Sequence, residues 1–379
     1  MSVIDTTLTI TPRHHDERPV LLTGATGFVG MELLVRVLEQ TDRDVVALVR
    51  AQDDAAAERR IDDLMRLLIA PADRHAVRGR VRAVAADLEQ PGLGMSESTR
   101  DELTESIGAV VHCAASVSFT LELEEARRIN VEGTREILRL AAEARDYGAL
   151  DRVVHVSTAY VAGERGGRAR ERQGDVGQSF RNTYEQTKLE AEQLVHDSGL
   201  PAAILRPSVI VGDSVTGWTP CFNVIYWPLQ AFARGLFDPI PGDAHAPIDI
   251  VPVDVVADAL LELLTGPVRC GPFHVVASDE AVSNQRLATM AADFFDTTPP
   301  TFVGPGVDPS AEVRAGVFMS YFKVRCTFDA LRGRRTLGAK PPPIEEYFPA
   351  LMRYARAARW GKAPANRWAV GVGALENVA

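Results

Sequence analysis

Three side chains have the types and spacing needed to reduce a carbonyl group. Tyr184 and Lys188 stand four residues apart in YEQTK, so they share one face of a predicted helix. Lowering the pKa of a phenol from about 10 toward 7 takes about 4 kcal/mol, which a neighbouring ammonium and a positively charged cofactor ring would supply. Thr158, in HVSTAYVAG, would hold the developing alkoxide by a hydrogen bond. We therefore predict that Tyr184 donates a proton as hydride reaches the carbonyl carbon.

A Tyr-x-x-x-Lys pair alone arises by chance on many helices, so a glycine-rich turn upstream matters. The run TGATGFVG has glycine at every third position and follows a predicted strand. Gly24 would make the tight turn, Gly27 would let backbone N–H groups approach a pyrophosphate, and Gly30 would allow close helix packing. Any tight strand-to-helix turn can use glycine, but the place of this run favours a dinucleotide at the helix N-terminus. We expect contacts from Thr23, Gly24, Thr26, Gly27, Phe28, Val29 and Gly30.

Two arginines favour NADPH over NADH. Arg50 ends the second strand, where an NAD-selective protein commonly carries an acid for the ribose hydroxyls. A guanidinium there would instead meet the 2′-phosphate, and one such contact favours NADPH by roughly ten- to a hundred-fold. Arg60, on the next helix, would supply a second contact. The alternative is that both arginines are merely solvated.

Further cofactor contacts are predicted where other strands end. Asp87 and Leu88 end the third strand, and the carboxylate is suited either to the adenine amino group or to capping the next turn. Ala114 and Ala115 end the fourth strand with small side chains, which simple sheet packing explains almost as well. We also place Pro207, in LRPSVIVG, beside the cofactor.

The elements that must position these residues alternate between apolar β-rich runs and helical stretches. Strands are predicted at 19–23, 44–49, 81–86, 108–114, 152–157 and 202–206, with a possible edge strand at 272–277. This pattern predicts an α/β fold, a doubly wound parallel Rossmann sheet with a smaller, mostly C-terminal α/β substrate domain. We expect a flexible tail at 1–18, an NADP-binding domain at 19–211 and 248–277, and a substrate-binding domain at 212–247 and 278–379.

Composition bounds the possible partners. A net charge of −10 and a pI of about 5.4 argue against nucleic acid. The four cysteines are widely separated and form no CxxC pair, so we expect neither a metal nor a disulfide framework, and a cytoplasmic location. The first eighteen residues lack the apolar stretch of a secretory signal, and no long apolar run predicts a membrane span.

Several other residues admit two interpretations. The aromatic residues between 218 and 237 suit an acyl channel or ordinary packing. His112 and His155 lie in apolar strands, so we expect hydrogen-bonded core histidines and not catalytic bases. For Asn130 we expect a structural hydrogen bond in preference to a role in ordering a proton-relay water. Asp249 and Asp254 would organise the segment returning over the cofactor. The aromatic set is Trp218, Phe222, Tyr226, Trp227, Phe232 and Phe237.

The motifs TGATGFVG, VVHCAAS, NVEGT, VSTAYV, YEQTK and LRPSVIVG resemble the extended short-chain dehydrogenase/reductase superfamily over residues 19 to 265. Within it, LVRA with the later Arg60, GDSVTGW (212–218) and DIVPVDVVADAL (249–260) are most similar to the thioester reductase and fatty acyl reductase branch. The resemblance implies NADPH-dependent reduction of an acyl thioester on coenzyme A or a carrier protein. It implies cofactor binding by Gly24, Gly27, Gly30, Arg50, Arg60 and Asp87 and catalysis by Thr158, Tyr184 and Lys188.

Two other functions remain open at this point. The same Thr, Tyr and Lys suffice for reduction of a ketone or aldehyde, or for nucleotide-sugar epimerisation. However, residues 218–237 are mostly apolar, and Arg234 is the only charged residue among them. A nucleotide diphosphate needs basic groups. A dinucleotide-sensing protein without catalysis is a third interpretation. Acyl length, the final product and the oligomeric state, including a homodimer, are not determined.

Overall fold

The computed structural model describes residues 18–235, 239–304, 307–308, 321 and 324–370. The predicted tail lies outside this set apart from Arg18, and so does Phe237. None of the described helices is both long and apolar enough to cross a membrane.

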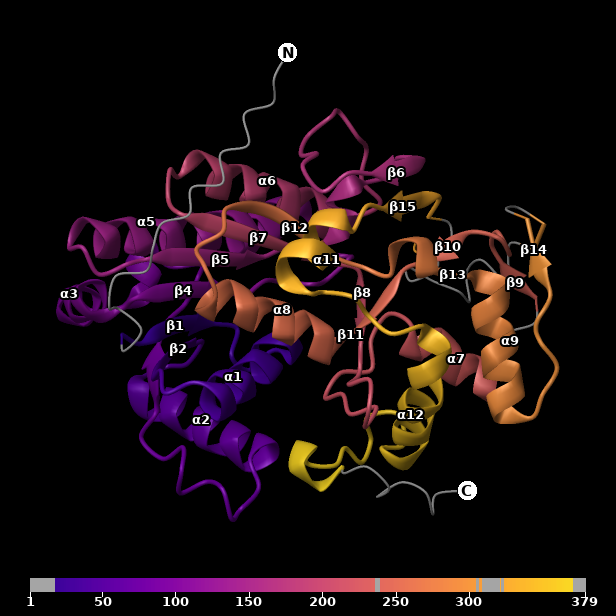
Figure 1. Cartoon of the computed structure of the whole chain (residues 1–379), viewed down its shortest axis with the longest axis horizontal. Helices are drawn as coiled ribbons and strands as arrows, with labels where there is room; N and C mark the ends of the chain where they lie inside the picture. Colours follow the sequence, from indigo (N-terminus) through magenta and orange to yellow (C-terminus); the bar gives the residue numbers. More distant parts are fainter. Residues whose placement is uncertain (1–17, 236–238, 305–306, 309–320, 322–323, 371–379) are drawn as a thin grey trace.

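A seven-stranded parallel sheet forms the centre of the molecule (Figure 1). The strand order is β12-β7-β5-β4-β1-β2-β3, so the predicted doubly wound sheet is confirmed, and the predicted edge strand is β12. Successive strands are added toward one edge of the sheet from β1 to β3 and toward the other edge from β4 onward. Ligands bind at such a switch point, which here lies between β1 and β4. The strands are β1 (Val20–Thr23), β2 (Val45–Val49), β3 (Val81–Ala85), β4 (Ala109–His112), β5 (Arg152–Val156), β7 (Ala202–Pro207) and β12 (Gly271–Val275).

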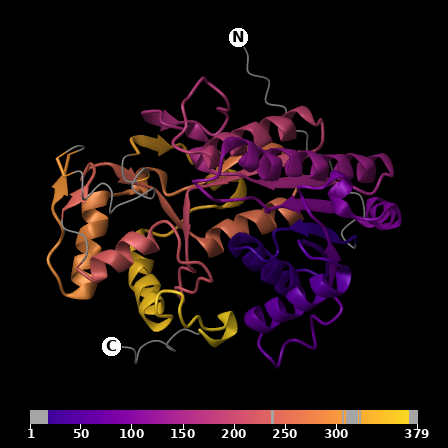
Figure 2. The same cartoon turned by 180° about the vertical axis from the view of Figure 1, so that it is seen from behind.

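Helices cover both faces of the sheet (Figures 1 and 2). The strands are apolar on both sides: Leu21 packs into one core and Leu22 into the other. One face carries α3 (Glu97–Ser106), α5 (Gly133–Asp146) and α6 (Thr183–Asp197), and the other carries α1 (Phe28–Gln40), α2 (Asp54–Leu68) and α8 (Val253–Thr265). Short helices follow β3, β4 and β5: η1 (Pro91–Gly94), α4 (Leu123–Arg127), the π-helix η2 (Arg128–Glu132) and η3 (Ala159–Ala162).

A second core lies beyond one end of the sheet and is built from late segments of the chain. Its helices are α7 (Tyr226–Ala233), α9 (Asn284–Phe295) and α12 (Ile344–Ala357), with η4 (Ser278–Glu280) next to β15. The late helix α11 (Leu331–Leu337) packs instead against β12 and α8, and η6 (Arg367–Ala369) packs against α2. Its strand pairs are β6 (Gly167–Ala169) with β15 (Cys326–Phe328), β8 (Val209–Val211) with β11 (Ile250–Pro252), β9 (Ile240–Pro241) with β14 (Phe302–Val303), and β10 (Pro247–Ile248) with β13 (Val282–Ser283). The proposed domain boundaries stay a prediction, and the β6–β15 pair crosses them.

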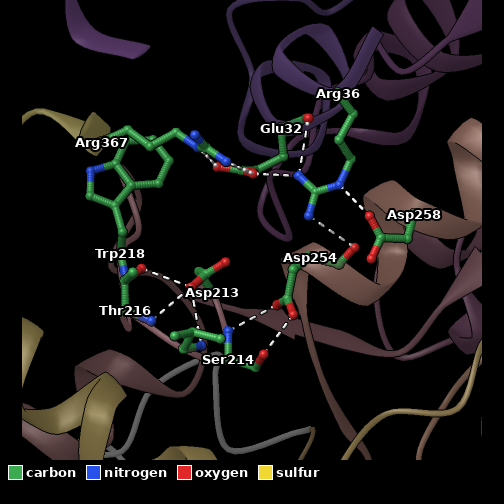
Figure 3. A network of polar contacts seen from close by, with 10 residues as sticks. Glu32, Arg36, Asp213, Ser214, Thr216, Trp218, Asp254, Asp258 and Arg367 are labelled. Atoms are coloured by element: carbon green, nitrogen blue, oxygen red, sulfur yellow. Dashed lines mark hydrogen bonds and ion pairs between the residues drawn. The ribbon is translucent and has the colours of Figure 1, made fainter. Parts of the chain in front are cut away.

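A buried ion-pair cluster joins the late segments to α1 (Figure 3). Glu32 on α1 is fully buried and pairs with Arg36 at 2.7 Å and with Arg367 of η6 at 2.8 Å. Arg36 also pairs with Asp258 of α8 at 2.5 Å. The cluster therefore fixes the C-terminal segment, which contains η6, and α8 against α1.

The GDSVTGW turn is tied to the same helices. The Asp213 carboxylate accepts hydrogen bonds from the backbone N–H groups of Val215 and Thr216, and Ser214 donates to Asp254 from both its backbone and its hydroxyl. Asp254 thus organises the returning segment, in agreement with the interpretation from the sequence. In this structure the GDSVTGW motif therefore holds the segment after β8 against α8.

Candidate active site

The glycine turn leaves room for little except backbone. Gly24 has a φ of +74°, and a Cβ there would lie 2.7 Å from the backbone nitrogen of Ala114. A Cβ on Gly30 would lie 2.1 Å from the carbonyl oxygen of Gly24. Helix α1 begins after Gly27, which has no side chain to cap it, so its first N–H groups are available to an anion. These features fit the pyrophosphate of a dinucleotide. Thr26, Phe28 and Val29 are half-buried around this helix start.

The two arginines lie side by side at the end of β2. Arg50 and Arg60 are both exposed, and the Arg60 guanidinium donates to the backbone carbonyl of Arg50. The structure therefore brings the pair together, although its contact with a 2′-phosphate stays a prediction.

The other predicted cofactor residues fall around the same edge. The Thr23 hydroxyl accepts a hydrogen bond from the backbone N–H of Ala114 at 3.1 Å, which joins the ends of β1 and β4. Ala115 follows Ala114 and is half-buried. Pro207 ends β7, and its carbonyl accepts a hydrogen bond from Thr158 at 3.4 Å. Thus residues from β1, β4, β5 and β7 meet at the carboxyl ends of the strands.

Asp87 adopts the capping role that the sequence had left open. Its carboxylate accepts a hydrogen bond from the backbone N–H of Glu89 at 3.0 Å. Leu88 packs closely against Gly133 of α5: a Cβ on Gly133 would lie 2.9 Å from the Leu88 side chain. Contact of either residue with adenine stays a prediction.

Tyr184 stands at the start of α6 and its ring is half-buried. Asn182 begins this helix by accepting a hydrogen bond from the backbone N–H of Glu185 at 3.0 Å. Burial raises the pKa of Tyr184 above its ordinary value, and a hydrogen bond with Thr158 partly offsets this rise. The phenol is therefore protonated at neutral pH when no cofactor is bound, which is the form that an acid catalyst needs.

Lys188 lies one helical turn further along α6 and is 2% exposed. Burial lowers the pKa of Lys188 to about 8. Its ammonium is 3.2 Å from Nε2 of His155 on β5. Its charge also lowers the pKa of Cys113, although burial dominates and raises that pKa to about 12. Since Gly24 packs directly against Cys113 and Ala114, Lys188 and the glycine turn lie at the same edge of the sheet.

Aromatic rings that sequence reasoning missed surround Tyr184. The ring of Phe119, in the loop after β4, lies 6.0 Å from that of Tyr184 and 5.1 Å from that of Tyr321. Tyr321 in turn packs edge-on against Tyr160 at 4.8 Å. For Phe119 the sequence offered one signal, an apolar ring in the loop after a strand at the switch point. No feature of the sequence indicated the contact of Phe119 with Tyr321.

Four aromatic residues of the segment 218–237 serve packing, whereas Trp227 is 38% exposed and supports neither interpretation. Trp218, Tyr226 and Phe232 are 1%, 2% and 8% exposed, and Trp218 donates to the carbonyl of Ala365. Phe222 stacks on Tyr354 at 6.0 Å. These contacts support the packing interpretation over an acyl channel for these four residues.

Other polar residues behave largely as the sequence suggested. Asn130 lies in the π-helix and makes structural hydrogen bonds to Ser116 and Thr187, so that prediction is confirmed. Asp249 is buried and accepts hydrogen bonds from the backbone of Ala277 and Ser278. His112 is satisfied on both ring nitrogens, whereas Nδ1 of His155 has no partner among the described residues.

The sheet order and the turn at its switch point define a protein of the extended short-chain dehydrogenase/reductase class. The model of the male sterility protein family, an NAD-binding domain, matches residues 22–260. Because this match covers more than half of the chain, the chain belongs to that family. The resemblance expected from the motifs is confirmed.

Relatives with named activities are similar over much of the chain. Isonitrile lipopeptide synthase of Streptomyces coeruleorubidus is 38% identical in an alignment 259 residues long that covers 65% of this chain and 16% of the synthase. Fatty acyl-CoA reductase wat of Drosophila melanogaster is 30% identical in an alignment 284 residues long that covers 65% of this chain and 54% of the reductase. The chain thus spans about half the length of that reductase and a smaller part of the synthase.

A solved reductase domain is similar over nearly its whole length. The terminal R domain from the myxalamid PKS-NRPS biosynthetic pathway superimposes with a TM-score of 0.78 at 28% identity. The match covers 93% of this chain and 94% of that domain. The described fold, including the late segments around α12, is therefore that of such a domain.

Proposed function

We propose that this protein uses NADPH to reduce an acyl thioester, carried on coenzyme A or a carrier protein, to an aldehyde or alcohol. The observation that carries the proposal is the meeting of Thr158, Tyr184 and Lys188 with the glycine turn at one edge of the sheet. The names of the relatives, a fatty acyl-CoA reductase and an R domain, favour a thioester among the possible carbonyl substrates. A cytoplasmic location and a homodimer stay predictions.

The chemistry assigns one task to each side chain. NADPH, which the glycine turn, Arg50 and Lys188 would hold, would supply a hydride to the carbonyl carbon of the thioester. Tyr184 donates its proton to the carbonyl oxygen, and the Thr158 hydroxyl holds that oxygen by a hydrogen bond. The resulting hemithioacetal would break its C–S bond, and its hydroxyl proton would leave with the sulfur, so that the thiol and the aldehyde are released. Reduction of the aldehyde to the alcohol would take a second NADPH and a second proton from Tyr184, once the phenolate has regained a proton from water. Lys188 would hold the nicotinamide ribose and stabilise the phenolate left on Tyr184.

Incubation with NADPH and a panel of acyl-CoA and acyl-carrier thioesters tests the proposal. We expect oxidation of NADPH together with release of free thiol and aldehyde. If no thioester gave cofactor oxidation but a ketone or aldehyde did, the runner-up function would replace the proposal. Stronger protection against thermal unfolding by a UDP-sugar than by acyl thioesters would favour nucleotide-sugar chemistry instead.

Replacing Arg50 by alanine tests the choice of NADPH. We expect the Kd for NADPH to rise by roughly ten- to a hundred-fold, because a charge-assisted contact with the 2′-phosphate is lost. The Kd for NADH should stay within about twofold, since NADH lacks that phosphate. Arg59→Ala, which removes the same charge from an exposed site beside Arg60, is the control. An equal loss of both cofactors would contradict the assignment.

Replacing Phe119 by alanine tests the aromatic wall beside Tyr184. Phe119 is half-buried and lies 6.0 Å from the catalytic ring, so we expect it to contact the first carbons of the acyl chain. The loss of about 1.5 kcal/mol of apolar contact should lower kcat/KM for long-chain thioesters roughly tenfold. Acetyl thioesters should be affected less. Val117→Ala in the same loop, where Val117 is 58% exposed, should leave the chain-length profile unchanged.

A further inference from the structure

The histidine that contacts Lys188 has no role in the chemistry described so far. We propose that His155 is a positioning residue: as a neutral imidazole it accepts a hydrogen bond from the Lys188 ammonium and keeps that cation directed toward the nicotinamide ribose. The inference rests on the proposed function, because it gives His155 a task in the same site.

The geometry leaves Lys188 dependent on this one contact. His155 is 1% exposed and its Nε2 is 3.2 Å from the Lys188 Nζ. Within the part of the chain that the structure describes, His155 is the one hydrogen-bond partner of that ammonium. An ammonium carries three N–H donors and no acceptor, so two donors remain for the hydroxyls of a bound ribose.

The proton positions follow from the neighbours. Because Lys188 can only donate, Nε2 of His155 is the acceptor and the imidazole carries its proton on Nδ1. The hydroxyl of Thr134 donates to the carbonyl of Asn130, so it accepts from Nε2 of His112, and Thr23 then donates to Nδ1 of His112. The two imidazole rings lie 5.3 Å apart, and burial lowers the pKa of both, so both are neutral near pH 7.

The groups facing Lys188 explain why the acceptor is not an anion. They are His155 from β5, His112 and Cys113 from β4 and its end, and Glu192 from α6. Glu192 is held in a buried pair with Arg206, whose Nε is 2.8 Å away, and the Cys113 thiol is neutral. A carboxylate at position 155 would neutralise the ammonium, whereas an imidazole orients it and leaves its charge to act on the Tyr184 phenolate.

The titration of Lys188 provides a direct measurement that needs no substrate. The chain contains four lysines, Lys188, Lys323, Lys340 and Lys362, so labelling lysine with ¹³C at Cε gives four signals, and Lys188→Arg assigns the one that matters. In the unaltered protein we expect this signal to titrate at about 8. His155→Leu removes the acceptor at similar size, whereas His155→Gln restores an acceptor oxygen near the position of Nε2.

The two variants should separate positioning from packing. Loss of a hydrogen bond to a charged group should lower the pKa of Lys188 from about 8 to about 7 in His155→Leu, and His155→Gln should restore it to about 8. The Kd for NADPH should rise about tenfold in the leucine variant and recover in the glutamine variant. In thioester turnover, the alkaline limb of the pH profile should move down with the pKa, because activity falls as Lys188 loses its proton.

An unchanged Lys188 titration and an unchanged NADPH affinity in His155→Leu, with a lower Tm alone, would overturn the proposal and leave His155 a core residue. If the leucine variant does not fold, His155→Asn replaces it, since that amide is too short to reach Nζ. The titration is measured without substrate. A protein that shows the expected shifts but reduces no thioester would therefore contradict the proposed function and not the role of His155.

Discussion

Replacing Tyr184 by phenylalanine is expected to lower kcat for thioester reduction by about 100- to 10,000-fold, which is the usual contribution of a positioned acid. The site places this phenol against Thr158, and its raised pKa keeps it protonated in the free protein. The Kd for NADPH should change by no more than about threefold, because the ring and the helix start are retained. Stopped-flow cofactor oxidation and fluorescence titration measure the two quantities.

The matched control for this change is Tyr147→Phe, which removes the same hydroxyl from a residue that is 62% exposed. It should leave turnover unaltered. A Tyr184 variant that kept more than about a tenth of the activity would show that the proton comes from another group. If the unaltered protein bound NADPH without any turnover and the variant retained its biological activity, the sensor interpretation would hold instead.

Replacing Glu32 by alanine is expected to lower the free energy of unfolding by about 3 kcal/mol. The carboxylate is fully buried between the guanidinium groups of Arg36 and Arg367, and its removal leaves Arg367 without this partner (Figure 3). Arg36 retains Asp258, which limits the loss. Urea denaturation followed by circular dichroism measures the change.

Two companion variants make this second test specific. Glu39→Ala lies on the exposed end of the same helix and should change stability by less than about 0.5 kcal/mol. Arg367→Met should cost less than Glu32→Ala, because the buried Glu32 carboxylate keeps its pair with Arg36 and the lost Arg367 side chain is 24% exposed. Equal stability of Glu32→Ala and the unaltered protein would mean that the C-terminal segment does not depend on this cluster.

Much of the fold could be predicted from local pattern. All six predicted strands, and the edge strand after α8, occur within a few residues of their expected bounds, because a strand buried on both faces must be a short apolar run. The turn at Gly24 was predictable for a related reason. Its positive φ and its contact with Ala114 both exclude a Cβ.

Part of the site needed coordinates. Phe119 and Tyr321 meet across about two hundred residues of sequence, and no periodicity relates a loop after β4 to a segment before β15. The same applies to Glu32 and Arg367, and to His155, which a strand pattern cannot distinguish from a satisfied core histidine. For the aromatic segment the sequence left packing and a channel equally open, and the contacts of Trp218, Phe222, Tyr226 and Phe232 favour packing for these four residues.

The order of residues along the chain is enough to place Thr158, Tyr184 and the glycine turn at strand and helix ends, because backbone geometry and i to i+4 spacing act over a few residues. Which side chain meets which across the sheet was settled by packing in three dimensions. His155 became the partner of Lys188 because β5 and α6 pack together, and Glu32 became buried because late segments of the chain cover α1.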